Sequence, residues 1–387
     1  MPPSRRPGPS SRLVAVDVAR CLALLGILVN HLVGGMPSLL LWDVHAVLFA
    51  TLVGVGAHLG TVGGRASSTV RAGVVRAGVL AVVGLALADL GTRAAIVLLT
   101  LAVVTLVATW AARRPTRTVL VAAAVLALVS PALARAGRAA SSGPGLPDVG
   151  WSDLADPPHA LATLLWATSY PAAVWPAFGL LGVAVARAFL PGDGRPPRPV
   201  SLALAGGALV LAGRVSSILV LAVTGRTALL DAEARAALEH SGLPDDADRL
   251  ALVGPYLPST PSLLVSGGLA LLVLAAVCAV CRLPRVPTSP PARALADLGS
   301  MTLSAYTLHV LLLPPTERVL AAHPGLDPWW VYAAHVGLLA AVLLTWRRVL
   351  PRPLAPGPLE WLTRRAITAV SPRSGPTPDP RPARRRA

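Results

Sequence analysis

Long apolar stretches alternate with short polar ones along most of the chain. Each apolar stretch is about 20 residues long, which is the length an α-helix needs to cross the bilayer core. A transmembrane β-strand would instead show about ten residues of alternating pattern. The pattern predicts an all-α polytopic membrane protein with about ten transmembrane helices. The predicted spans are 13–33, 41–62, 70–88, 94–112, 118–136, 170–190, 200–224, 261–283, 296–313 and 328–349.

Composition agrees with a lipid environment. Of the 387 residues, 54% are hydrophobic and 13% are charged, and the mean hydropathy is +0.65. Soluble domains carry about 25% charged residues, so this chain has too few to cover a water-facing surface. The transmembrane domain is predicted over 13–349, followed by a juxtamembrane segment over 350–370. Residues 1–12 and 371–387 are Pro- and Arg-rich tails that we expect to be disordered.

The net charge of +16 comes entirely from arginine, because the chain has no lysine. The arginines lie in short loops and in the tails, which indicates topogenic charge on the cytoplasmic side rather than nucleic-acid binding. Alternate loops are Arg-rich: Arg65, Arg71 and Arg76; Arg113, Arg114 and Arg117; Arg187, Arg195 and Arg198; Arg282, Arg285 and Arg293; Arg347, Arg348 and Arg352. This alternation predicts a multipass plasma-membrane protein with both termini in the cytoplasm. The Ala- and Arg-rich composition is typical of a GC-rich bacterial genome.

Two predicted outer loops are long, 137–169 and 225–260, and contain half of the 18 acidic residues. Long loops are often functional, and these two could roof an external cavity. The adjoining region is rich in proline and contains Trp166, Tyr170 and Trp175. These aromatic residues could form an interfacial belt or could line a substrate path.

The first span contains three ionisable residues, Asp17, Arg20 and His31. Ionisable groups within a membrane are costly, so each one is a candidate functional residue. At 100° per residue, Arg20 and His31 lie about 20° apart on one helix face, separated by a rise of about 16 Å. Asp17 lies within about 60° of Arg20. The spacing predicts Arg20 towards the cytoplasm and His31 near the outer surface, with Asn30 able to orient the His31 ring.

Further candidates lie on other spans. His309 is in the outer half of the ninth span, with Tyr306 one turn below it. Asp43 and His45 begin the second span at its outer side. Arg214 is in the middle of the seventh span, where an exposed guanidinium would cost at least about 2.5 kcal/mol, so we expect it to face the helix bundle or an anionic ligand.

Other ionisable residues favour a structural interpretation. His58 and His335 are each expected to pack between helices. Cys21, Cys278 and Cys281 lie in or beside apolar helices without a second Cys pair, so we expect small core residues and no metal site.

The segment from Arg20 to His31 resembles the R-x10-H signature of the bacterial membrane acyltransferase-three family. The longer segment that begins DVAR at Asp17 is similar to the first helix of heparan-alpha-glucosaminide N-acetyltransferase-like proteins. Both families belong to one transmembrane acyltransferase superfamily with about ten core helices. Further similar segments are Tyr170-Pro171 with Trp175, Pro258 to Pro261, Gly299 to His309, and Gly357 to Trp361. Cys21 departs from the pattern, because these families usually have Gly after the Arg.

The resemblance implies transfer of an acyl group, in particular acetyl, from cytoplasmic acyl-CoA to an extracytoplasmic sugar, glycan or glycolipid. His31 would be the general base or a transient acyl carrier, with Asn30, His309 and Asp43 as the other catalytic candidates. Arg20 would bind CoA from inside, with Asp17 and Arg214 as further cofactor-binding candidates. The candidate substrate-lining residues are His45, Trp166, Tyr170, Trp175 and Tyr306.

Two other classes of protein are compatible with the sequence. A transporter or flippase would also place buried charges and proline-broken helices along a substrate path. A structural or regulatory membrane protein without chemistry is the third interpretation. The sequence leaves the acceptor, the choice between O- and N-acylation, and the oligomeric state open.

Overall fold

The computed structural model describes residues 11–34, 43–62, 66–140, 148–190, 196–230, 247–351 and 353–370. Every regular element within these ranges is a helix. The α-helices are α1 (Ser11–Val33), α2 (Val44–Thr61), α3 (Ala66–Ala88), α4 (Leu98–Ala111), α5 (Thr116–Ala140), α6 (Pro157–Ala162), α7 (Pro176–Phe189), α8 (Pro199–Val223), α10 (Thr260–Cys281), α11 (Pro290–Gly299), α12 (Thr302–Ala322), α13 (Pro328–Val349) and α14 (Pro358–Ala369). Short 3₁₀ turns η2 (Ser152–Ala155) and η4 (Ala247–Ala251) and the π-helical turn η3 (Thr163–Ala167) complete them.

The fold confirms an all-helical protein with membrane-spanning character. Within the described ranges, seven helices are long and apolar enough to cross a bilayer, namely α1, α2, α3, α5, α8, α10 and α13. The helices α4 and α7 are apolar but have only 14 residues each. A helix occupies each of the ten predicted segments, whereas the number of spans and the orientation of the termini stay predictions.

Proline and small polar residues determine where several helices begin. Proline occupies the first turn of α6, α7, α8, α10, α11, α13 and α14, where its missing N–H leaves no hydrogen bond unmade. The N-cap side chains of Asp156, Ser259, Ser289 and Asp327 each accept a hydrogen bond from a backbone N–H of the helix that follows.

The predicted ninth span, 296–313, is wrong in its boundaries. The structure ends α11 at Gly299 and begins α12 at Thr302. A Cβ atom on Gly299 would lie 1.7 Å from the Asp17 carbonyl oxygen, so glycine is required where α11 meets α1. At its other end, α12 continues through Pro314 and Pro315 to Ala322.

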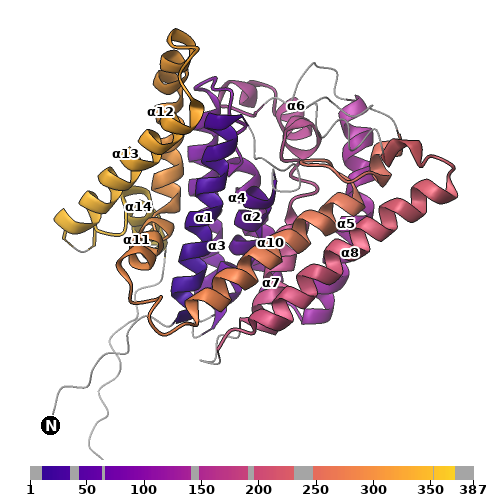
Figure 1. Ribbon diagram of the computed structural model, residues 1–387, viewed down its shortest axis with the longest axis horizontal. Coiled ribbons are helices and arrows are strands. Elements are labelled where there is room, and N and C mark those ends of the chain that lie inside the picture. Colours follow the sequence, from indigo (N-terminus) through magenta and orange to yellow (C-terminus); the bar gives the residue numbers. More distant parts are fainter. Residues whose placement is uncertain are drawn as a thin grey trace, which may run out of the picture.

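The helix α1 lies at the centre of the bundle and packs against α2, α10, α11, α12 and α13 (Figure 1). Figure 1 shows α8 and α10 on one side of this centre and α12, α13 and α14 on the other. Glycines permit the closest crossings. A Cβ atom on Gly54 of α2 would lie 1.9 Å from the Gly179 carbonyl oxygen of α7, and one on Gly268 of α10 would lie 2.5 Å from the Gly206 oxygen of α8.

The outermost helices present apolar side chains outward. Val200, Leu204 and Leu211 of α8 are 65–72% exposed, and Leu128 of α5 is 66% exposed. Large exposed apolar faces of this kind are typical of contact with lipid. We call the end of the bundle where α1 begins the inner end and the end where α1 finishes the outer end, in line with the predicted topology.

Candidate functional site

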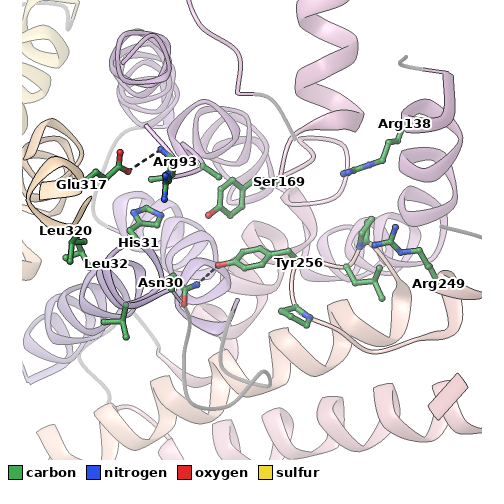
Figure 2. A pocket seen from close by; sticks show the side chains of 18 of the residues that line it. Asn30, His31, Leu32, Arg93, Arg138, Ser169, Arg249, Tyr256, Glu317 and Leu320 are labelled. Carbon is green, nitrogen blue, oxygen red and sulfur yellow. Dashed lines mark hydrogen bonds between the residues drawn. The ribbon is translucent and has the colours of Figure 1, made fainter. Parts of the chain in front are cut away.

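A cavity of about 840 Å³ opens near the outer end of α1. Several separate segments line it: the end of α1, the turn before α4, the end of α5, the turn after η3, the segment from η4 to Pro258, and the outer part of α12. Arg138, Ser169 and Arg249 belong to the two long loops predicted to roof an external cavity, or lie at their edges (Figure 2). We call this space the outer cavity.

A second cavity, of about 350 Å³, lies at the inner end of the bundle. Arg20 of α1, Arg76 of α3 and Arg364 of α14 line it, together with Glu360. Its remaining lining is mostly apolar and comes from α1, α2, α3, α4, α12 and α14. We call this space the inner cavity. Its basic mouth and apolar depth suit a ligand with a phosphate head and a less polar arm.

The wall between the two cavities is thin. Ile27 lines the inner cavity and His31 lines the outer one, and these residues are about one helical turn, or roughly 5 Å, apart along α1. In the turn before α4, Ala95 lines the outer cavity and Val97 lines the inner cavity. Tyr306 lines the inner cavity from α12. A group at the Ile27 end of the inner cavity therefore lies about one helical turn from His31 along α1.

Three histidines form one hydrogen-bonded chain behind the outer cavity. His31 Nδ1 lies 3.0 Å from His309 Nε2, and His309 Nδ1 lies 2.9 Å from His335 Nε2. The His31 and His309 rings are nearly parallel, with centroids 5.2 Å apart. His309 is fully buried and His335 is 5% exposed, whereas His31 is half-buried and borders the cavity. Helices α1, α12 and α13 each contribute one histidine.

Thr316 fixes the direction of this chain. Its hydroxyl donates its proton to the Leu312 carbonyl oxygen at 2.7 Å, so it can only accept from His335 Nδ1, which lies 3.4 Å away. A neutral His335 protonated at Nδ1 accepts at Nε2 from His309, and His309 in turn accepts at Nε2 from His31. The remaining nitrogen, His31 Nε2, then bears a lone pair. The chain thus favours the His31 tautomer that can act as base or nucleophile.

Asn30, predicted to orient the His31 ring, takes part in a second polar cluster with His45 and Tyr256. Its Nδ2 atom lies 2.9 Å from His45 Nε2 and donates to the Tyr256 hydroxyl at 3.0 Å (Figure 2). The Tyr256 oxygen lies 3.4 Å from His45 Nε2. Burial raises the pKa of Tyr256 well above its ordinary value, so the phenol stays protonated. Asn30 and Tyr256 line the outer cavity, while His45 lies buried behind them.

Asp43 supports the loop that contains Tyr256. Its Oδ2 atom accepts hydrogen bonds from Ser266 Oγ at 2.7 Å and from the Tyr256 backbone N–H at 3.3 Å. Tyr256 has a φ of 55°, which is rare for a residue with a side chain. Strained residues of this kind are typical of ligand-binding sites. Asp43 itself is 5% exposed and does not border the outer cavity, so the geometry supports a positioning role more than the predicted catalytic one.

Arg20 and Asp17 form an ion pair at the inner end of α1. Arg20 Nη1 donates to Asp17 Oδ1 at 3.0 Å. A Cβ atom on Gly56 of α2 would lie 3.1 Å from Arg20 Nη2, so glycine leaves room for the guanidinium. Arg20 borders the inner cavity and Asp17 does not. The structure therefore separates Arg20 and His31, expected to face one channel, into two cavities.

The predicted substrate-lining aromatics lie in different places. Tyr170 borders the outer cavity, and its ring meets Tyr256 edge to face, with centroids 5.6 Å apart. Trp175 is buried between Tyr170 and Phe178. Trp166 packs over Gly137 of α5. Tyr306 borders the inner cavity instead.

Arg214 is half-buried on α8 and lines neither cavity. The geometry therefore gives no support to the cofactor-binding role predicted for it. The helix α8 packs mainly on α10, away from α1.

Two carboxyl groups outside the spans fix the cavity walls. Asp148 accepts from the Ile96 backbone N–H at 2.9 Å, in the turn that separates the cavities. Glu360 accepts from the backbone N–H groups of Leu303 and Ser304 and so caps α12 from α14. Burial raises the pKa of Asp148 to about 6 and also raises the pKa of Glu360.

Sequence reasoning missed several residues of the site. His335 was expected only to pack, and Thr316 was not singled out. The arginines of the outer cavity were also missed, although Arg135 and Arg138 lie on the predicted outer side, where topogenic charge is not expected. That exception to the charge alternation was the signal that could have found them.

Comparisons with protein-family models and with curated proteins give no match for this chain.

Proposed function

We propose that this protein is a membrane acyltransferase that moves an acyl group, in particular acetyl, from acyl-CoA to a hydroxyl or amine of an extracytoplasmic sugar or glycan. The observation that carries the proposal is the histidine chain that ends at His31 in the thin wall between two cavities. A donor on one side of the membrane and an acceptor on the other side must reach one common point to react. A base at that point can take the proton of the acceptor.

The inner cavity suits the donor. Arg20, Arg76 and Arg364 can pair with the phosphates of CoA, and the apolar depth suits the pantetheine arm. To reach His31, the acyl end must pass Ile27, Val97 and Tyr306, over about one helical turn.

The chemistry needs one base. The acceptor oxygen or nitrogen attacks the thioester carbonyl while His31 Nε2 takes its proton. The carbon–sulfur bond breaks, and the thiolate takes up that proton to leave as CoA thiol. A transient acyl group on His31 gives the same products in two steps. In both routes His309 and His335 orient the His31 ring and disperse its positive charge.

The test uses radiolabelled acetyl-CoA with membranes of an expressing bacterium, which contain cell-envelope acceptors. We expect label to move into a non-CoA product, and His31→Ala to lower the rate by about 10²–10⁴-fold. Arg20→Ala should raise the KM for acetyl-CoA more than it lowers kcat. Arg114→Ala is the control, because Arg114 is exposed and lines neither cavity. Near-normal transfer by His31→Ala would overturn the proposal.

Two opposed cavities with a thin wall also favour a transporter. A carrier would move an intact substrate across vesicles without releasing CoA thiol. Substrate flux that persists in His31→Ala, with no CoA release from the wild type, would support this second candidate.

A further inference from the structure

The described residues that line the outer cavity include more basic than acidic side chains, and one of the arginines, Arg138, also donates to the Thr168 carbonyl oxygen at 3.3 Å. Four arginines line the cavity, Arg93, Arg135, Arg138 and Arg249, and Glu317 is the single acid among its described lining residues. The arginines come from the turn before α4, from the last turns of α5 and from η4. Three distant parts of the chain therefore bring guanidinium groups to one space.

The topology does not explain these arginines. Topogenic arginines collect on the cytoplasmic side, whereas these four lie at the opposite end of the bundle from Arg20 and Arg364. The two predicted outer loops are rich in acidic residues, yet four of the five charged residues that are described around this cavity are arginines. Charge of one sign in a cleft with low-dielectric walls attracts ligands of the opposite sign.

The arrangement leaves room for the reacting group. Figure 2 shows Arg138 and Arg249 across the cavity from His31. Figure 2 shows Tyr256 between these walls, and Tyr170 also lines the cavity. The partly exposed Tyr256 ring is an aromatic surface of the kind that packs against sugar rings. The volume of about 840 Å³ is large enough for a molecule with a reactive group at one end and a charged group at the other.

We infer that the acceptor is anionic: a sugar or glycan unit whose phosphate or carboxylate binds Arg138 and Arg249 while its hydroxyl or amine lies at His31. Arginine is suited to this task because its planar fork pairs with both oxoanions through two parallel hydrogen bonds. The inference rests on the proposed function for the step at His31, but the binding of the anion does not.

The experiment measures equilibrium binding without acyl-CoA, using purified protein in nanodiscs and three radiolabelled probes: glucose 1-phosphate, glucuronate and glucose. We expect at least one anionic probe to bind about tenfold more tightly than glucose and to weaken as salt rises. Comparison of the phosphate and carboxylate probes identifies the anion. His31→Ala should bind the probes normally, so a failure of acyl transfer and a failure of anion binding can be told apart.

Variants locate the site. Arg249→Gln and Arg138→Gln should each weaken the anionic probe about tenfold and leave glucose unchanged. Arg249→Lys keeps the charge but loses the planar guanidinium. It should bind the anionic probe more tightly than Arg249→Gln but less tightly than the wild type, which distinguishes a loss of recognition from a loss of folding. Arg113→Gln, at an exposed inner-end position, is the control. Equal binding of all three probes, or normal binding of the anion by both Gln variants, would overturn the inference.

Discussion

The Thr316 hydroxyl has a single proton, and its donation to Leu312 favours one set of tautomers along the three histidines. Thr316→Val keeps the side-chain shape but removes the acceptor at His335 Nδ1. The chain His335–His309–His31 can then reverse, which would place the proton on His31 Nε2 and remove the base. We expect kcat for acyl transfer to fall about tenfold or more, with the KM for acetyl-CoA unchanged.

The measurement is the pH–rate profile of wild type and Thr316→Val, together with nitrogen NMR of labelled histidines. Thr288→Val, on an exposed inner turn, is the matched control. A tautomer pattern and profile equal to those of the wild type would show that Thr316 does not orient the chain.

Asp148 predicts a pH dependence of stability. Burial raises the pKa of its carboxyl from 3.8 to about 6, so the folded state binds its proton more tightly than the unfolded state. The stabilisation is complete below about pH 4 and is lost as pH rises through about 6. Asp148→Asn keeps an oxygen that can accept from Ile96, and should raise the free energy of unfolding at pH 7.5 by at most about 3 kcal/mol.

Thermal melts in detergent at pH 4.5 and 7.5 check this expectation. At pH 4.5 the Asp148→Asn variant should melt much closer to the wild type than at pH 7.5, where it should melt higher. Asp156→Asn, at the exposed N-cap of α6, is the control. A lower melting temperature for Asp148→Asn at pH 7.5 would contradict the sign.

The sequence could predict those site residues that one helix relates to each other. The arithmetic of a single helix places Arg20 and His31, and it placed His309 at the right height. It could not predict His335 or Arg249, because their place depends on how α13 and η4 pack against the rest of the bundle. A lone histidine on an apolar helix has the same neighbours in sequence whether it only packs between helices or hydrogen-bonds to a histidine of another helix.

At the scale of elements, α14 closes the inner cavity and is fixed through Glu360. Glu360→Ala would leave the Leu303 and Ser304 N–H groups at the start of α12 without their acceptor, which costs about 1–3 kcal/mol. Glu360 fixes α14, and α14 also contributes Arg364 to the inner cavity. Loosening of α14 should therefore displace Arg364 and weaken acetyl-CoA binding. Glu360→Gln retains one acceptor oxygen and should lose less stability.

Thermal melting and acetyl-CoA binding of both variants provide the measurement. Arg365→Ala is the control, because Arg365 is an exposed residue of α14 that does not line the inner cavity. Unchanged melting in Glu360→Ala would mean that α14 docks by its apolar residues alone.

The positions of the helices were predictable because the length of an apolar stretch and the place of proline at a helix start are local properties of the sequence. Their ends were less so: α4 begins at Leu98 and α7 at Pro176, several residues after the predicted starts. The intervening backbone is non-helical where it lines the cavities, as irregular backbone at membrane depth requires. Apolar content cannot distinguish such a turn from a helix.

At the scale of the whole molecule, function depends on which end of the bundle faces the cytoplasm. Because acyl-CoA is a cytoplasmic compound, the proposed function requires that the cavity with Arg20 opens inward and the cavity with His31 outward. The alternation of arginine-rich loops predicts this orientation. Because Cys21, Cys278 and Cys281 are all buried, an introduced surface cysteine can be labelled selectively.

We expect a membrane-impermeant maleimide to label Arg226→Cys on intact cells, since position 226 is exposed at the outer end. Arg114→Cys, exposed at the inner end, should be labelled only after the cells are permeabilised. Wild-type protein supplies the background. The reverse pattern would place the three arginines of the inner cavity outside the cell, where no acyl-CoA is present. It would therefore contradict both the predicted topology and the direction of acyl transfer, while leaving the transporter and the membrane protein without chemistry as the remaining interpretations.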